Sequence, residues 1–240
     1  MNNIFKTIIL LGRPASGKSE VINFLKNSKS EVRSDKFHVG KIIEIDDFPM
    51  LWTWFEEDDI LEKVFKKPRL HSSSDGYFLH EYFWHLLIER ICFDYKKSIR
   101  DMKDENDKIT RLIEFSRGSE HGGYKIAFSH LSKELLEEAV IIYVNVPFEE
   151  SLRKNRKRFN PEKPDSILEH GLPDSKLERM YKLVDWEDVT KGTTTYININ
   201  GIDVPYVVFE NMPSKTDDQA LLEPALYDVT TRLWNIYSKK

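Results

Sequence analysis

The chain has 240 residues, of which 40% are hydrophobic and 32% charged, and its formal net charge is −4. This length and composition suit one folded α/β domain with an inserted or appended lid, and the acidic balance counts against an extended nucleic-acid interface. No apolar run approaches the ~20 residues of a membrane span. The single cysteine, Cys92, excludes an intramolecular disulfide, so we expect a cytoplasmic setting.

Residues 12–19 fit the Walker A pattern G-x-x-x-x-G-K-[ST] at every fixed position. The apolar run at 6–11 predicts a short buried strand before this loop, and the pattern of 19–26 predicts an amphipathic helix after it. In that setting the loop N–H groups and the helix N-terminus bind phosphate. Lys18 would reach the β- and γ-phosphates, and the Ser19 hydroxyl would bind Mg²⁺. The predicted nucleotide-binding residues are Gly12, Arg13, Pro14, Ala15, Ser16, Gly17, Lys18 and Ser19.

A second strand is predicted at 41–45, after a polar connecting loop at 27–36, and it ends in Asp46 and Asp47. Carboxylates at the carboxyl end of a strand lie on the ligand-binding edge of an open α/β sheet. Asp also suits a helix N-cap or a turn, so a purely structural role is the alternative.

The segment 48–110 is predicted to be a helical insertion on the substrate side. Its first part, 48–55, is dense in aromatic residues, which could line a pocket or pack in a core. A short helix is predicted at 60–65, stopped by Pro68, then a loop, then a long helix at 77–100.

A third strand is predicted at 111–116, with Glu114 near its end. An acid in this position suits the second acidic motif of P-loop proteins, which holds Mg²⁺ directly or through water. The alternative is an exposed carboxylate at a strand end. Arg117 and the glycines up to Tyr124 are expected to form a flexible loop before a helix at 125–138.

A buried strand is predicted at 139–146, followed by a basic helix at 149–158. Arg153 and Arg156 are three residues apart and therefore share one helix face. A cationic face beside a nucleotide would stabilise charge on a transferring phosphoryl group, whereas the plainer alternative is a solvated basic helix. The segment 153–176, Pro-rich in its second half, is the candidate lid.

The remaining chain predicts a helix at 177–186, strand-like runs at 196–199 and 204–209, and a closing helix at 221–237. Strands and helices thus alternate over 1–240. This alternation predicts a single domain with a doubly wound, mainly parallel five-stranded sheet of the P-loop NTPase type, with helices on both faces and a lid-like insertion.

At this point the chain resembles the P-loop kinase group of nucleoside, nucleotide and small-molecule kinases. The resemblance is carried by the Gly12–Ser19 loop, by Asp46 and Asp47, and by Arg153, Arg156 and Arg158. In that group an Asp after the second strand often acts as base for, or binds, the accepting hydroxyl, and arginines from a lid-like helix clamp the phosphates. The chain lacks the Asn/Thr-Lys-x-Asp guanine motif of GTPases and the signature of transporter ATPases.

The resemblance implies an ATP- and Mg²⁺-dependent phosphotransferase acting on an unidentified small hydroxylated or phosphorylated acceptor. Its catalytic residues are expected to be Lys18, Asp47, Arg153 and Arg156, and its metal ligands Ser19, Asp46 and Glu114. One alternative is a nucleotide-binding switch or regulatory ATPase, whose protein partner would dock on Trp52, Trp54 and Phe55. A polynucleotide end kinase is the other alternative, although the acidic balance makes nucleic acid an unlikely partner.

Overall fold

The computed structural model describes residues 3–158 and 171–239. In these residues one sheet has six strands in the order β2-β3-β1-β4-β6-β5. Neighbouring strands are parallel except for the antiparallel β5–β6 pair. The strands are β1 Thr7–Gly12, β2 Lys41–Asp46, β3 Ile109–Phe115, β4 Ala139–Asn145, β5 Tyr196–Ile199 and β6 Ile202–Glu210.

The predicted doubly wound, mainly parallel P-loop architecture is confirmed, but the predicted count of five strands is wrong. The sixth strand exists because β5 folds back on β6 across Asn200 and Gly201, whose φ angles are 52° and 83°. Two central residues with positive φ form the turn that matches the twist of a hairpin, so β5 extends the sheet by one short edge strand.

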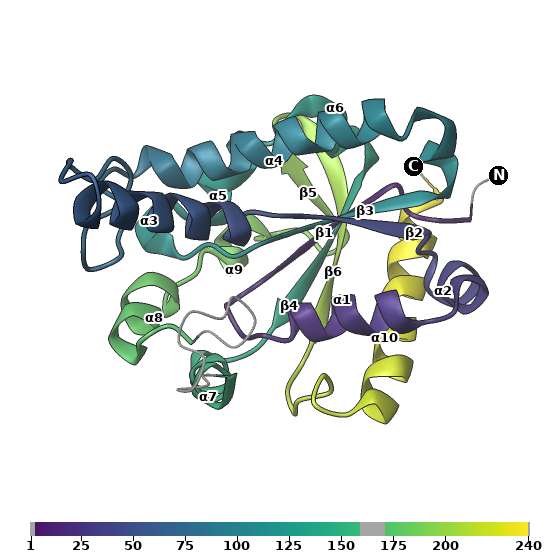
Figure 1. Cartoon of the computed structure of the whole chain (residues 1–240). Helices are drawn as coiled ribbons and strands as arrows, with labels where there is room; N and C mark the ends of the chain where they lie inside the picture. Colours follow the sequence, from purple (N-terminus) through teal and green to yellow (C-terminus); the bar gives the residue numbers. More distant parts are fainter. Residues whose placement is uncertain (1–2, 159–170, 240) are drawn as a thin grey trace.

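Helices cover both faces of the sheet (Figure 1). Every residue of β1 is buried, as expected for a central parallel strand covered on both sides. The helices with their bounds are α1 Lys18–Asn27, α2 Ser30–Phe37, α3 Phe48–Lys63, α4 Tyr82–Asp101, α5 Gly123–Ser129, α6 Lys133–Glu138, α7 Phe148–Arg158, α8 Asp174–Tyr181, α9 Trp186–Val189 and α10 Gln219–Tyr237, with short 3₁₀ turns at Lys103–Lys108 and Ser119–His121.

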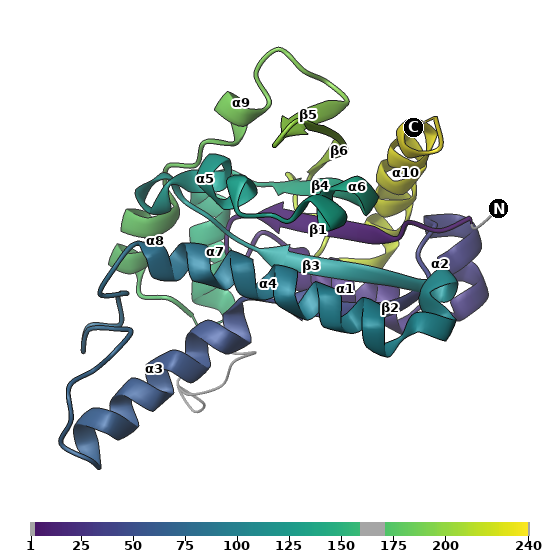
Figure 2. The ribbon, with the colours of Figure 1, turned by 90° about the horizontal axis from the view of Figure 1, so that it is seen from above.

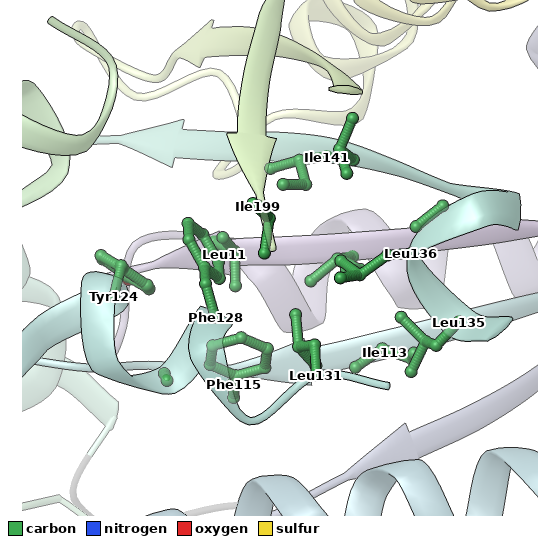
Figure 3. Packing of buried hydrophobic residues seen from close by; sticks show 14 of the residues in the cluster. Leu11, Ile113, Phe115, Tyr124, Phe128, Leu131, Leu135, Leu136, Ile141 and Ile199 are labelled. Atoms are coloured by element: carbon green, nitrogen blue, oxygen red, sulfur yellow. The ribbon is translucent and has the colours of Figure 1, made fainter. Parts of the chain in front are cut away.

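The two largest apolar cores of the described residues lie one on each face of the sheet. On one face the sheet packs against α4, α5 and α6, as Figure 3 shows for Leu11 and Ile113 of the sheet and for Phe128 and Leu136 of the helices. On the other face it packs against α1 and α10. Burying both faces keeps the parallel strands out of water and leaves their carboxyl ends free for chemistry.

Helix α3 begins directly after Asp47 and extends away from the sheet (Figure 2). The predicted short helix at 60–65 is wrong in extent, because α3 covers Phe48–Lys63 and takes in the aromatic segment. Among its residues only Asp58 is fully buried, so the periodic apolar pattern that marks a helix in sequence is weak here. We call α3 together with residues 64–81 the arm.

Three other predicted boundaries are wrong. The predicted loop at 27–36 contains α2. Only Phe37 of this helix is buried, so its sequence lacks the apolar stripe that would predict a helix. The single helix predicted at 125–138 is two helices, because the Ser132 hydroxyl caps a new helix at the Leu135 N–H. The helix predicted at 177–186 is divided between α8 and α9.

Within residues 3–158 and 171–239, no helix is both long enough and apolar enough to cross a membrane.

Candidate functional site

The loop between β1 and α1 contains three residues with positive φ angles, and two of them are glycines. Gly12, Ala15 and Gly17 have φ angles of 149°, 54° and 111°. A Cβ atom on Gly17 would lie 2.6 Å from the Thr216 hydroxyl, and one on Gly12 would lie 2.6 Å from the Val144 carbonyl oxygen. Both glycines are therefore required by conformation and by space.

Side chains from three other elements brace this loop. The Gly12 N–H donates to the Tyr124 hydroxyl at 3.2 Å, the Ser151 hydroxyl donates to the Pro14 carbonyl at 2.7 Å, and the Asn211 amide donates to the Ser16 carbonyl at 2.8 Å. Tyr124 belongs to α5, Ser151 to α7, and Asn211 follows β6. The loop thus keeps its shape before any ligand binds, which lowers the entropy cost of binding.

The Arg13 side chain makes structural contacts within the protein. Its guanidinium donates to the carbonyl oxygens of Val146, Tyr181 and Lys182 at 2.9, 3.1 and 3.2 Å. Its backbone still belongs to the predicted nucleotide-binding loop, but its side chain fastens that loop to the ends of β4 and α8.

Two features of the loop fit a bound phosphate. Helix α1 starts at Lys18, and its N-cap residue Gly17 supplies no side-chain cap, so the first N–H groups of the helix remain available to an anion. The Ser16 hydroxyl is buried and has no hydrogen-bond partner in the described part of the chain. Buried polar atoms are rarely left unpaired unless a ligand or water completes them.

Lys18 lies inside the loop and is only 5% exposed. Its ammonium group donates to the carbonyl oxygens of Gly12 and Arg13 at 3.2 and 2.9 Å and to the Ser116 hydroxyl at 2.9 Å, and it lies 3.8 Å from a Glu114 oxygen. Burial lowers the pKa of Lys18, while Glu114, Asp46 and Asp47 oppose that shift. The predicted phosphate-binding cation is therefore held in place by the loop itself.

The sheet brings Asp46 and Glu114 together, since they are register partners at the ends of β2 and β3. Burial raises the pKa of Glu114, with the Lys18 charge opposing the shift and the Asp47 charge adding to it. Removal from water and the charges of Asp47 and Glu114 raise the pKa of Asp46 as well. Asp46 is exposed, so repulsion between the neighbouring carboxylates explains its raised pKa better than burial does. A cation between them would relieve it.

Asp47 has a different environment, because one of its oxygens pairs with the buried Arg117 guanidinium at 2.7 Å. The Asp47 residue is 9% exposed and the Arg117 residue 1%. Arg117 was expected in a flexible loop. Its loop is instead tightly packed, since a Cβ on Gly118 would lie 1.7 Å from the Met180 carbonyl oxygen.

Ser19, Asp46 and Glu114 offer only oxygen ligands, which is the donor type that Mg²⁺ prefers. Magnesium commonly takes one or two carboxylates and completes its shell with water and substrate phosphates. Among the described residues no group of three or more His, Cys, Asp or Glu side chains is arranged to hold a metal ion. A metal bound by these residues would therefore need further ligands from water and a nucleotide.

The basic helix α7 divides its charges between two faces. Arg153 pairs with Glu150 and Asp217, and Arg156 pairs with Asp174; both arginines are more than half exposed. Lys154, only 6% exposed, donates to the Thr216 hydroxyl at 2.8 Å, beside Gly17. The structure thus brings Lys154 to the back of the loop and leaves Arg153 and Arg156 engaged at the surface.

The candidate lid is described only in part, because residues 159–170 lie outside the described residues. Its two flanks are joined where the Asn155 side-chain amide both donates to and accepts from the Leu172 backbone, at 2.7 and 3.0 Å.

The aromatic residues of the arm mostly pack on one another. Trp54 stacks on His71 at 5.2 Å between ring centroids, and both Trp54 and Phe55 contact Phe78. The most exposed apolar residues of the arm are instead Val64, Phe65 and Leu70, which follow α3.

A hollow of about 450 Å³ lies between β2, the start of α3 and α4, and Asp46 is among its lining residues. Its volume is in the range of sites for small molecules.

The sequence predicted no site role for Arg117, Tyr124 or Ser151. Arg117 follows β3 by two positions, so the strand-end reasoning that singled out Asp47 after β2 applies to it equally. Tyr124 and Ser151 gave no comparable signal, because their roles depend on contacts with residues more than a hundred positions away.

No protein-family model matches the chain, and no curated protein is significantly similar to it in sequence. Among solved structures, a shikimate kinase from Acinetobacter baumannii in complex with shikimate is 15% identical, with a TM-score of 0.44 over 100% of this chain and 96% of that one. A protein named APE1195 is 13% identical, with a TM-score of 0.42 over 98% of both chains. A sugar kinase from Janibacter sp. HTCC2649 is 12% identical, with a TM-score of 0.41 over 95% of this chain and 96% of that one.

Proposed function

We propose that this protein is an ATP- and Mg²⁺-dependent phosphotransferase whose acceptor is a small molecule carrying a hydroxyl group. The observation that supports this proposal is the gathering, at one edge of the sheet, of a braced phosphate loop with a buried lysine and of carboxylates in two different environments. A site that only bound phosphate would not require the second set of groups.

The residues divide by environment. The loop N–H groups and Lys18 hold the phosphates of ATP, and Lys18 stabilises the charge that develops on the transferring group. Asp47, held by Arg117, receives the acceptor hydroxyl. Arg153 and Arg156 remain candidates for charge stabilisation, and they would first have to leave their present acidic partners.

Ser19, Asp46 and Glu114 would hold Mg²⁺, which supplies positive charge to the phosphate oxygens when bound. The raised pKa values of Asp46 and Glu114 are consistent with this assignment. Two carboxylates that repel each other are stabilised in their charged form by a cation bound between them.

The transfer itself conserves atoms and charge. The acceptor oxygen forms a bond to the γ-phosphorus, the bond from that phosphorus to the β–γ bridging oxygen breaks, and ADP leaves with the electron pair. The hydroxyl proton moves to a carboxylate oxygen of Asp47 and from there to solvent.

A screen of acceptors for ADP release tests the proposal, starting with nucleosides, nucleotides and sugars. We expect one class to raise ADP release well above its rate in water alone, and the Asp47→Asn variant to lose that gain while binding ATP as before. The exposed Asp59→Asn variant, with the same change of charge, serves as the control. A flat screen together with unchanged turnover in Asp47→Asn would contradict the proposal.

One observation favours a second function, a nucleotide-dependent switch. Val64, Phe65 and Leu70 of the arm expose 66, 62 and 59% of their surface, which a partner protein could cover. A switch would hydrolyse ATP at a rate that no acceptor raises, and Phe65→Ser would abolish partner binding while leaving hydrolysis intact.

A further inference from the structure

Arg117 carries a buried charge next to the proposed acceptor site. Its guanidinium donates to an Asp47 oxygen and to the Ser116 carbonyl oxygen, both at 2.7 Å, and to the Trp84 carbonyl oxygen at 3.2 Å. Its central carbon lies 5.3 and 5.4 Å from the ring centroids of Trp84 and Phe115. Two backbone carbonyls and two aromatic rings therefore fix the position and the plane of the guanidinium.

Asp47 is the carboxylate that balances this charge, and among the described residues Arg117 makes no other ion pair. A buried arginine without a partner is strongly unfavourable, so each group holds the other in place. The nearby His121 adds no competing charge, because burial and the positive charges of Arg117 and Arg179 lower its pKa to about 3.

The pair is not arranged for stability alone. The buried Nε of Arg117 has no hydrogen-bond partner within residues 3–158 and 171–239. Asp47 Oδ2 is occupied by Arg117, whereas the described residues provide no donor to Asp47 Oδ1. The carboxylate therefore keeps one oxygen available while its orientation is fixed through the other.

The Arg117 segment is also joined to the phosphate loop. The Ser116 hydroxyl accepts from the Lys18 ammonium group at 2.9 Å, and the Ser116 carbonyl oxygen accepts from the Arg117 guanidinium at 2.7 Å. Asp47 is thus held, through Arg117 and Ser116, in a fixed relation to the loop that would carry the γ-phosphate.

We propose that Arg117 is a positioning residue: through the Arg117–Asp47 ion pair it aims the free oxygen of Asp47 at the acceptor hydroxyl. This inference rests on the proposed function, in which Asp47 receives that hydroxyl.

The test is a double-mutant cycle with ATP hydrolysis by water as the probe reaction, since water then occupies the place of the acceptor hydroxyl. The variants are Arg117→Met, Asp47→Asn and the two combined. We expect each single variant to lower kcat by about 10²-fold, the order of one general-base contribution, with the KM for ATP changed less than twofold. The combined variant should be no slower than either single variant, because both changes remove the same contribution.

Folding is followed by thermal unfolding and by binding of a fluorescent ATP analogue. Should Arg117→Met fail to fold, Arg117→Lys replaces it. Lysine keeps the charge but lacks the planar fork that contacts Asp47 and two carbonyls together, so kcat should fall at unchanged KM. The combined variant should unfold at a higher temperature than Asp47→Asn, which leaves the arginine charge buried alone.

The outcomes separate the two proposals. No ATP turnover by the unchanged protein with water or with any acceptor of the screen, or full turnover by Asp47→Asn, would overturn the proposed function. An impaired Asp47→Asn beside a fully active Arg117→Met would overturn the positioning role alone. The same holds if the two losses multiply in the combined variant, or if Arg117→Met acts through the KM for ATP.

Discussion

Two regions of this molecule place acidic side chains in opposite environments. In the arm, Asp58 is completely buried and accepts hydrogen bonds from the Leu70, His71 and Ser72 N–H groups and from the Ser72 hydroxyl. At the strand ends, Asp46 lies beside Glu114, an oxygen of Glu114 lies 3.8 Å from the Lys18 ammonium group, and Asp47 uses one oxygen for one arginine.

The pKa values separate the two regions in the same way. Burial alone would raise the pKa of Asp58, but its donors lower it to about 2. At the strand ends burial and neighbouring carboxylates raise the pKa values of Asp46 and Glu114. A carboxylate that accepts several hydrogen bonds holds a structure together, whereas neighbouring carboxylates with raised pKa values are typical of a ligand site. We therefore expect changes in the arm to cost stability and changes at the strand ends to cost activity.

The largest effect is expected for Lys18→Met. ATP turnover should fall by about 10²–10³-fold, the cost of one preorganised electrostatic contact, while thermal stability changes little, because relief from the burial of the ammonium group offsets the loss of its contacts with Glu114 and the loop. Kinetics and thermal unfolding measured on one preparation check both parts. Lys26→Met, an exposed change on the same helix, is the control. A variant that lost stability together with activity would erase the distinction between the two regions.

Gly118→Ala should destabilise the protein by about 3 kcal/mol or more, because the new Cβ would meet the Met180 carbonyl oxygen. Its backbone does not require glycine (φ −110°), so the effect is one of space alone. Gly192→Ala is the matched control: nothing lies within 4 Å of its Cβ, although its φ of 78° carries some strain. Chemical denaturation compares the two, and equal losses would refute the spatial explanation.

Asp58→Asn should cost about 2 kcal/mol of unfolding free energy at pH 7. Because the folded pKa lies below the unfolded value, this contribution is complete above about pH 4 and is lost as the pH falls through about 2. Wild type and variant should therefore converge in acid. Denaturant titrations at pH 7 and at about pH 2 measure the convergence, with the exposed Asp35→Asn as control. A difference that does not depend on pH would show that the carboxylate charge is not what holds the arm.

The smallest effects are expected for Arg153→Gln and Arg156→Gln. Exposed ion pairs of this kind contribute at most about 1 kcal/mol, so the unfolding free energy should change little. Turnover should fall by a smaller factor than in Lys18→Met. A loss as large as that of Lys18→Met would place these arginines among the groups that act on the transferring phosphoryl group.

The sequence was sufficient where a local pattern decides the structure. The glycine loop with its flanking strand and helix is such a case, as are the continuous apolar runs of β1 and β4. It also located Asp46 and Asp47, because any residue just after a parallel strand lies on the ligand edge.

Local pattern was insufficient where few residues of an element are buried or where partners are distant in sequence. Helix α2 buries only Phe37 and α3 only Asp58, so neither carries an apolar stripe. The Asp47–Arg117 pair joins residues 70 positions apart, and no periodicity records such a contact. The basic helix α7 was predicted correctly, yet which of its cations face inward depends on how it docks.

The bracing of the phosphate loop has a consequence for how this protein is made. The loop is synthesised first, but its contacts come from Tyr181 and Asn211, which are 168 and 195 positions removed from Arg13 and Ser16. Contacts of such high sequence separation form late, because a long stretch of chain must be ordered before they can close. Under the proposed function, a nascent chain would carry its glycine loop for most of its synthesis in a form that binds ATP weakly. Nucleotide binding would then report that the later part of the chain has folded around the loop.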